Sequence, residues 1–288
     1  MPTILVTGAG GKTGMAVIAA LVRRGQAVRA IVRDEQRAAA ASALGAQAII
    51  GDLADPSTVA RAAQGARAIY HIGPNVSSAE VAFGRTAIAA AMHAGVERFV
   101  YHSVLHPQIA AMPHHWDKLR VEELLLASGL AVTFLRPTAY MQNILAGWPA
   151  IRDAGIYRTP YPVTTRISLV DLADVAESAA LVLTTGGHTG AAYDLVGTPA
   201  LSQAEVAAEL GRTLGRPVRA EAESVEAWDA RARASGLGDH QRETLTKMFC
   251  YYSRHGLTGS PQVLHWLLGR APGTLAAFAR RAAAGELG

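Results

Sequence analysis

Lysine and cysteine are scarce in this chain of 288 residues. Its 27 basic residues include three lysines, Lys12, Lys118 and Lys247, and Cys250 is the single cysteine. A single cysteine excludes an internal disulfide and a cysteine-rich metal cluster, and it suits a reducing compartment. Because arginine supplies positive charge nearly everywhere else, a retained lysine indicates a position that needs a compact ammonium group.

Long hydrophobic runs are also missing. No apolar stretch is long enough to cross a bilayer, and a first strand expected from about Thr3 leaves no room for a signal peptide. We therefore expect a cytoplasmic protein that does not bind membranes. The net charge of +4 is mild and the basic residues are scattered, so nothing indicates nucleic-acid binding. Half of the residues are hydrophobic, which is ample for a buried core.

Glycine is concentrated near the start of the chain, where TGAGGKTG (residues 7–14) holds four glycines. An apolar run precedes this segment, and a stretch with helical spacing follows it and ends at Gly25. A loop between a first strand and a first helix is where α/β folds hold a dinucleotide pyrophosphate, because the helix amides and dipole meet the anion there. The alternative is that these glycines only form a tight turn and bind no ligand. The candidate pyrophosphate residues are Gly8, Gly10, Gly11, Lys12, Thr13 and Gly14.

Strand and helix patterns alternate through the first half of the chain. Strands are expected at 27–33, 46–52, 66–74, 96–104 and 131–137, and helices at 14–25, 35–44, 55–65, 80–95 and 115–129. This alternation predicts a parallel sheet covered on both faces, a doubly wound α/β Rossmann fold. We assign residues 1–137 to this dinucleotide-binding core. Residues 138–288, including a helix capped by Asp171, are assigned to remaining strands and a mostly helical C-terminal subdomain packed on the core as one compact unit.

The end of the second strand bears on which dinucleotide is bound. NAD sites usually place an acid there for the ribose 2′-hydroxyl, whereas NADP sites place an arginine for the 2′-phosphate. Arg33 holds this place and favours NADP(H), but Asp34 would favour NAD(H) if it faced the ribose. After the third strand, Asp52 and Leu53 are candidates for the adenine edge, with an ordinary turn or cap as the alternative for Asp52.

Several motifs together point to one family: TGAGGKTG, IVRD, GDLAD, HSVLHP, HHWDKLRVEELLLASGL and LRPTAYMQN, with YYSRHGLTG and VLHWLLGR nearer the C-terminus. In these the chain resembles, over nearly its whole length, the NmrA-like group of atypical short-chain dehydrogenase/reductases. That group includes NADP(H)-dependent quinone, triphenylmethane-dye and azo-dye reductases, and also cofactor-sensing regulators without an evident reaction. The resemblance implies further cofactor contacts, with core packing as the alternative for Tyr140: Gly73, Ser103, Pro137, Tyr140 and Asn143.

Common short-chain dehydrogenases use a Y-x-x-x-K motif, in which the lysine holds the nicotinamide ribose and helps the tyrosine to donate a proton. In this chain Lys118 fits the lysine, while His114 stands where the tyrosine would be. The resemblance implies that Lys118 binds the nicotinamide ribose; a surface pair with Glu122, four residues on, is the alternative. His114 is a candidate proton donor because histidine ordinarily titrates near neutral pH.

Four histidines lie near this motif: His102, His106, His114 and His115. They lack an acidic partner nearby and have poor spacing for a ligand set, so we expect no metal site.

Two functions remain open at this point. The first is an NADPH-dependent oxidoreductase that passes a hydride to a small electron-poor aromatic or conjugated acceptor: a quinone, azo dye, triarylmethane dye or enone. The second is a non-catalytic NADP(H) sensor read by a partner protein. The missing tyrosine disfavours a sugar-nucleotide epimerase or dehydratase. The oligomeric state is open, with a homodimer as one candidate.

Overall fold

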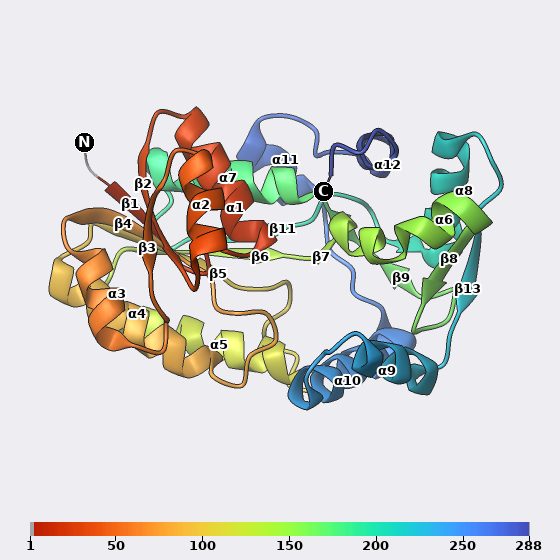
Figure 1. The fold of residues 1–288 in the computed structure, drawn as a ribbon, viewed down its shortest axis with the longest axis horizontal. Coiled ribbons are helices and arrows are strands. Elements are labelled where there is room, and N and C mark those ends of the chain that lie inside the picture. The colour runs from red at the N-terminus through yellow and green to blue at the C-terminus, as the bar shows by residue number, and fades with distance from the viewer. Residues whose placement is uncertain (1–2, 288) are drawn as a thin grey trace. The chain divides into compact units, whose positions relative to one another are not determined.

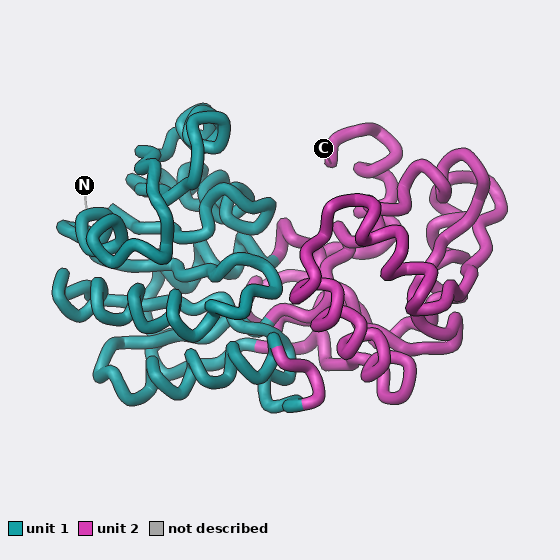
Figure 2. Tube along the Cα trace, turned by 60° about the horizontal axis from the view of Figure 1, so that its bottom comes forward, with its two compact units in different colours: residues 1–110, 114–136, 175–193 teal, residues 111–113, 137–174, 194–288 magenta. Residues whose placement is uncertain are grey.

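The computed structural model describes residues 3–287, which form two compact units (Figure 2). The first unit contains the described residues up to Ala110, then His114–Arg136 and Val175–Tyr193. The second contains Ala111–Pro113, Pro137–Asp174 and the described residues from Asp194 onward. The chain therefore enters the second unit at Ala111–Pro113 and again at Pro137, and Val175–Tyr193 returns to the first unit. The predicted division at 137 stays a prediction.

A seven-stranded parallel sheet in the order β11-β6-β5-β4-β1-β2-β3 is the framework of the first unit (Figure 1). Its strands are β1 Thr3–Val6, β2 Ala27–Val32, β3 Gln47–Ile50, β4 Ala66–His71, β5 Arg98–His102, β6 Val132–Pro137 and β11 Ala192–Leu195. The strand order reverses between β1 and β4, and ligands bind at such a switch point in doubly wound sheets. The predicted fold class is confirmed.

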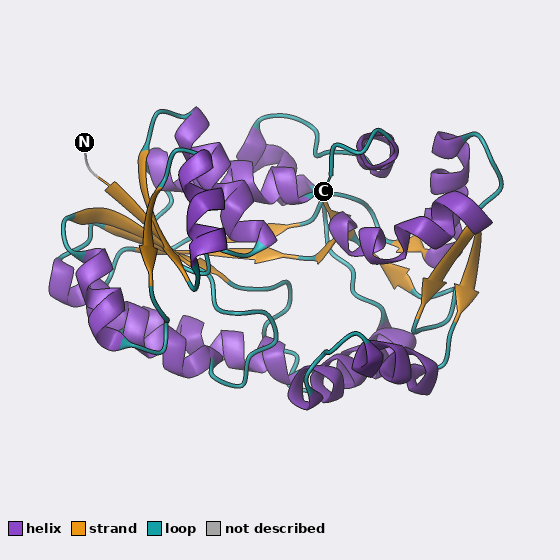
Figure 3. Ribbon diagram, in the orientation of Figure 1, coloured by secondary structure: helices purple, strands orange, loops and turns teal. Residues whose placement is uncertain are grey.

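Helices cover both faces of this sheet (Figure 3). They are α1 Lys12–Arg23, α2 Glu35–Ala43, α3 Pro56–Ala63, α4 Glu80–Ala94, α5 Pro113–Ala127 and α7 Leu172–Thr184. In Figure 1, α1, α2 and α7 lie on one face, and α3, α4 and α5 lie on the other. Local sequence explains the ends: Pro56 starts α3, and the Asp55 side chain accepts hydrogen bonds from the amides of its first turn.

The core on the α3–α5 face is apolar and closely packed. Leu5, Ile69 and Phe99 of the sheet pack against Val121 and Leu125 of α5, and all five are fully buried. Burial of each such side chain stabilises the fold by about 1.5–3 kcal/mol. This packing fixes the positions of β4, β5 and α5, which carry most of the polar side chains considered below.

The second unit combines helices with three two-stranded sheets. Its helices are η1 Met141–Gly147, α6 Trp148–Ala154, α8 Gln203–Leu214, α9 Val225–Ala234, α10 Asp239–His255, α11 Gln262–Leu268 and α12 Leu275–Ala283. Its strand pairs are β7 Ala139–Tyr140 with β10 Leu169–Val170, β8 Ile156–Thr159 with β13 Arg219–Ala222, and β9 Arg166–Ile167 with β12 Leu201–Ser202. The mostly helical character is as predicted, whereas these small sheets were not foreseen.

Two buried acids at the start of α7 anchor the C-terminal segment of the second unit. Asp171 pairs with Arg281 and, as the predicted cap, accepts a hydrogen bond from the Ala173 amide at 3.0 Å. Asp174 pairs with Arg270 at 2.8 Å and accepts a further hydrogen bond from a backbone amide. Both acids are buried, so their charges depend on these partners.

Within residues 3–287, no helix combines the length and the apolar character that a membrane span requires.

Candidate active site

The glycine loop joins β1 to α1 and is held in a conformation that needs glycine. Gly8 has a φ of +57°, and a Cβ there would lie 2.6 Å from the carbonyl oxygen of Ile72. A Cβ on Gly14 would lie 2.6 Å from the carbonyl oxygen of Gly8. Gly11 differs, because a Cβ there would come no closer than 3.5 Å to the rest of the chain. Two of the glycines therefore shape the loop, and the third keeps its outer surface open.

Gly11 is also the N-cap of α1, and no side chain caps this helix. By contrast, Asp34 caps α2 and Asp55 caps α3. The first turn of α1 contains no acidic residue, so its free amides lie at the positive end of the helix dipole without a neighbouring negative charge in that turn. This cradle suits the pyrophosphate of a dinucleotide.

Two arginines flank the acid that follows β2. The Asp34 side chain accepts a hydrogen bond from the Arg37 amide at 2.8 Å and pairs with the Arg37 guanidinium. These contacts, the amide bond first, hold the pKa of Asp34 below its usual value. Its carboxylate is therefore committed to its own helix, while Arg33 is exposed. The Arg37 side chain lies against Gly10, since a Cβ on Gly10 would come within 3.2 Å of its Cγ.

Arg37 is a candidate residue that the sequence reasoning missed. The available signal was its position four residues after Arg33, on the first turn of the helix that follows β2. Arg33 and Arg37 are both candidates for binding an anionic ribose substituent, and the preference for NADP(H) stays a prediction.

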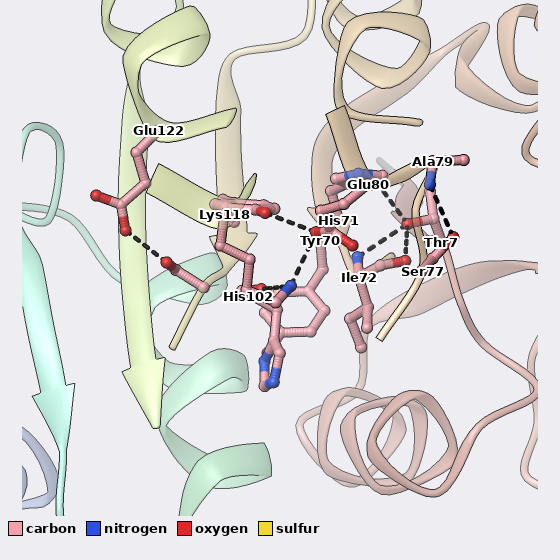
Figure 4. A network of polar contacts seen from close by, with 12 residues as sticks. Thr7, Tyr70, His71, Ile72, Ser77, Ala79, Glu80, His102, Lys118 and Glu122 are labelled. Atoms are coloured by element: carbon pink, nitrogen blue, oxygen red, sulfur yellow. Dashed lines mark hydrogen bonds and ion pairs between the residues drawn. The ribbon is translucent and has the colours of Figure 1, made fainter. Parts of the chain in front are cut away.

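A buried polar cluster surrounds Lys118 of α5, whose ammonium group reaches His102 at the carboxyl end of β5 (Figure 4). Its Nζ donates to Oε1 of Glu80 at 2.8 Å and to the carbonyl oxygen of His102 at 3.1 Å. The Tyr101 hydroxyl donates to the same Glu80 oxygen at 2.7 Å. Lys118 therefore pairs with Glu80, and the alternative of a surface pair with Glu122 is wrong.

Glu122 instead serves a second buried cluster. It accepts a hydrogen bond from Oγ of Ser103 at 2.5 Å and another from Nε of Arg136 at 3.0 Å. Because the Ser103 hydroxyl is already used in this way, any contact between Ser103 and a cofactor is left mainly to its backbone. That contact stays a prediction.

The histidines beside the Lys118 cluster are buried. His71 Nδ1 lies 2.8 Å from Oγ1 of Thr7, and His102 Nδ1 lies 2.6 Å from the Tyr70 hydroxyl oxygen. Burial, aided by the charge of Lys118, lowers the pKa of His71 to about 4 and that of His102 to about 3. Both rings are therefore neutral at pH 7.

His114 shares this behaviour. Burial, with a smaller contribution from the Lys118 charge, lowers its pKa to about 4. The expectation that His114 titrates near neutral pH is therefore wrong. As a neutral imidazole it is a weak acid, so the structure gives no support for His114 as an imidazolium proton donor. Within residues 3–287, no three His, Cys, Asp or Glu side chains are grouped to hold a metal ion.

Several known proteins are similar to this chain in sequence and fold over nearly their full length. The model of the NmrA-like family matches residues 1–275. The chain belongs to the NmrA-like family. The NAD(P)H azoreductase of Xenophilus azovorans is 32% identical over 286 residues, which cover 98% of each chain. Quinone oxidoreductase 2 of Escherichia coli (strain K12) is 30% identical, over 95% of this chain and 96% of that protein.

A solved structure supports the same relationship. The NADPH-dependent quinone oxidoreductase from Escherichia coli, crystallised in complex with NADPH, matches this NmrA-like chain with a TM-score of 0.85 and 30% identity. The match covers 97% of this chain and 99% of that one.

The remaining predicted contacts of this NmrA-like protein vary in exposure. The Asp52 carboxylate accepts a hydrogen bond from the Ala54 amide at 2.9 Å, which is the turn role held open as its alternative. The Leu53 side chain is buried in the apolar core, so only its backbone is available to adenine. Gly73 is buried beside Glu80. Cofactor contacts at these three positions stay predictions.

In the second unit, three predicted residues lie at or after the end of β6. Pro137 is buried, Tyr140 is half-buried in β7, and Asn143 is exposed in η1. Met141 is fully buried. Tyr140 is therefore only partly packed, whereas the alternative interpretation placed it in the core. Contacts of Pro137, Tyr140 and Asn143 with a cofactor stay predictions.

Proposed function

We propose that this protein is an NADPH-dependent reductase that delivers a hydride to electron-poor conjugated acceptors. Quinones, azo dyes, triarylmethane dyes and enones are the acceptor classes. The main support is the glycine cradle before the uncapped start of α1, in a chain with full-length similarity to an NAD(P)H azoreductase and a quinone oxidoreductase.

The residues of the first unit have distinct roles in this proposal. The loop from Gly8 to Gly14 binds the pyrophosphate, and Arg33 with Arg37 binds the 2′-phosphate. Lys118 holds the nicotinamide ribose. When bound, NADPH supplies the hydride, and the protein contributes mainly orientation and electrostatics.

Proton balance separates the acceptors. A quinone gains one hydride and one proton to become a hydroquinone, whereas a cationic triarylmethane dye gains a hydride alone and becomes neutral. Because His114 is neutral at pH 7, with a pKa of about 4, solvent is the proton source that we assign to quinone reduction. Acceptors that need no proton should therefore be at least as good as those that need one.

The test is anaerobic NADPH oxidation against a panel of these acceptors, with NADH in parallel. Lys118→Met removes the proposed ribose contact, and Lys247→Met, at an exposed lysine paired with Glu243, is the matched control. Turnover that prefers NADPH, collapses in the first variant and persists in the second would support the proposal. Tight NADPH binding without turnover on any acceptor would refute it and favour a cofactor-sensing regulator.

A further inference from the structure

A buried carboxylate lies directly behind the candidate ribose-binding lysine. Glu80 is the first residue of α4, and its side chain is 4% exposed. Its Oε1 accepts a hydrogen bond from Lys118 (Figure 4) and another from Tyr101. Neither the pyrophosphate cradle nor hydride delivery requires this acid, so its burial needs a separate explanation.

Gly73 leaves the space that the Glu80 carboxylate occupies. A Cβ on Gly73 would lie 2.8 Å from Cδ and 3.0 Å from Oε1 of Glu80. The φ of Gly73 lies outside the left-handed region, so its backbone does not itself demand glycine. Together with its burial, this indicates that Gly73 is needed to accommodate Glu80.

The ammonium group of Lys118 is held from several sides. Besides Glu80, it contacts the carbonyl oxygen of His102 and lies 5.2 Å from the centre of the Tyr101 ring. Its side chain keeps 17% exposure. An ammonium carries three N–H donors, and the hydrogen bonds of Lys118 to Glu80 and His102 use two of them. The third N–H is available to a ligand.

Glu80 and Lys118 form the ion pair of this cluster. Burial alone would raise the pKa of Glu80, but the charge and hydrogen bond of Lys118, with the hydrogen bond from Tyr101 added, keep the pKa below its usual value. The neighbouring His71 and His102 are neutral at pH 7, with pKa values of about 4 and about 3. A buried carboxylate thus faces the lysine, and no opposing histidine charge weakens the pairing at neutral pH.

We propose that Glu80 is a positioning residue, which orients Lys118 so that its third N–H is presented to the nicotinamide ribose. Gly73 serves the same arrangement indirectly by making room for the Glu80 carboxylate. This inference rests on the proposed function, because it assumes that Lys118 meets NADPH. It assigns Glu80 no contact with the cofactor or with the acceptor.

A double-mutant cycle on NADPH affinity tests the proposal. Glu80→Gln keeps the size of the side chain and removes its charge, and we expect it to weaken NADPH binding about tenfold. In a Lys118→Met background the same change should have no further effect, because there is no ammonium left to orient. A merely structural Glu80 would act equally in both backgrounds, and that result would overturn the proposal. So would wild-type affinity in the single variant.

Control variants distinguish a positioning role of Glu80 from a general loss of folding or stability. Glu243→Gln removes the acid of the exposed Glu243–Lys247 pair, whose N–O distance is 2.7 Å, and should leave NADPH affinity unchanged. If Glu80→Gln does not fold, Glu80→Asp keeps both charges and withdraws the carboxylate from Lys118. It should weaken NADPH binding in the wild-type background but not beside Lys118→Met.

Spectroscopy supplies a readout of Lys118 itself. Since the chain has three lysines, carbon-13-labelled lysine gives an assignable spectrum, with Lys247 as an internal reference. NADPH should shift the Lys118 Cε signal in wild type and shift it less in Glu80→Gln. An equal shift in both proteins would overturn the proposal. These binding readouts stand apart from turnover: wild type that binds NADPH without reducing any acceptor fails only the proposed function, whereas wild type that does not bind NADPH fails both.

Discussion

Mild acid should destabilise this protein through histidines that are buried in their neutral form. His71 is fully buried, and its folded pKa of about 4 lies below the value of about 6.5 expected in the unfolded chain. Between these values the unfolded chain binds the proton and the folded chain does not. The stability that a neutral His71 provides is therefore complete above about pH 6.5 and decreases as the pH falls toward 4.

The size of the effect at pH 5 follows from this difference. The unfolded histidine is almost fully protonated there and the folded one is mostly neutral, so going from pH 7 to pH 5 costs about 2 kcal/mol per such histidine. His102, with a folded pKa of about 3, has nearly the same effect, because protonation of the unfolded chain dominates both cases. Glu80, whose pKa is lowered, stays ionised over this range. Together the two histidines account for about 4 kcal/mol.

Urea unfolding of His71→Asn at pH 7 and pH 5 tests this account. The variant also loses a hydrogen bond with Thr7 at both pH values, so the informative quantity is the change in unfolding free energy between them. That change should be about 2 kcal/mol smaller than in wild type. His93→Asn, at an exposed helix position, should keep the wild-type change. A pH dependence as large in His71→Asn as in wild type would refute the reasoning.

Three further outcomes test other parts of the molecule. Gly8→Ala should lower the free energy of unfolding by about 1–2 kcal/mol because of its left-handed backbone, and by more because of a steric clash. Gly25→Ala, where φ is +69° and a Cβ would meet nothing within 4 Å, has only the backbone effect, so urea unfolding of both variants separates the two contributions. Arg33→Ser and Arg37→Ser should each lower the NADPH-to-NADH ratio of kcat/KM about tenfold or more, through loss of a charge-assisted bond; an unchanged ratio would contradict their assignment. Asp174→Asn should lower the free energy of unfolding by about 1–3 kcal/mol, measured in urea, because it weakens a buried ion pair; wild-type stability would argue against the anchor.

Much of the fold was predictable because its signals are local. Helical periodicity, the Asp55 and Pro56 start signal and the stop at Gly25 each lie within a few residues of the element that they define. The strands of the large sheet follow from apolar runs between such helices. The small sheets of the second unit have strands of two to four residues, which are too short for a periodic pattern to be recognised.

The candidate site was predictable where it depends on a contiguous motif, as in the glycine loop. The partner of Lys118 was not predictable, because Glu80 lies 38 positions away and reaches it through the packing of α4 and α5 on the sheet. Spacing along α5 suggested Glu122 instead, yet burial directs that acid to Ser103 and Arg136. The lowered pKa of His114 was not predictable for the same reason, since it depends on burial, which only the folded chain shows.

The anchoring of the C-terminal segment by two acids constrains how the chain folds during its synthesis. Asp174 precedes Arg270 by 96 positions, and Asp171 precedes Arg281 by 110. On the ribosome, both carboxylates therefore emerge long before their arginine partners have been made. The first unit is also discontinuous, because it takes Val175–Tyr193 from beyond a segment of the second. The second unit is therefore the last to be completed, and a chain that stops before Arg270 retains two acids whose ion pairs with Arg270 and Arg281 never form.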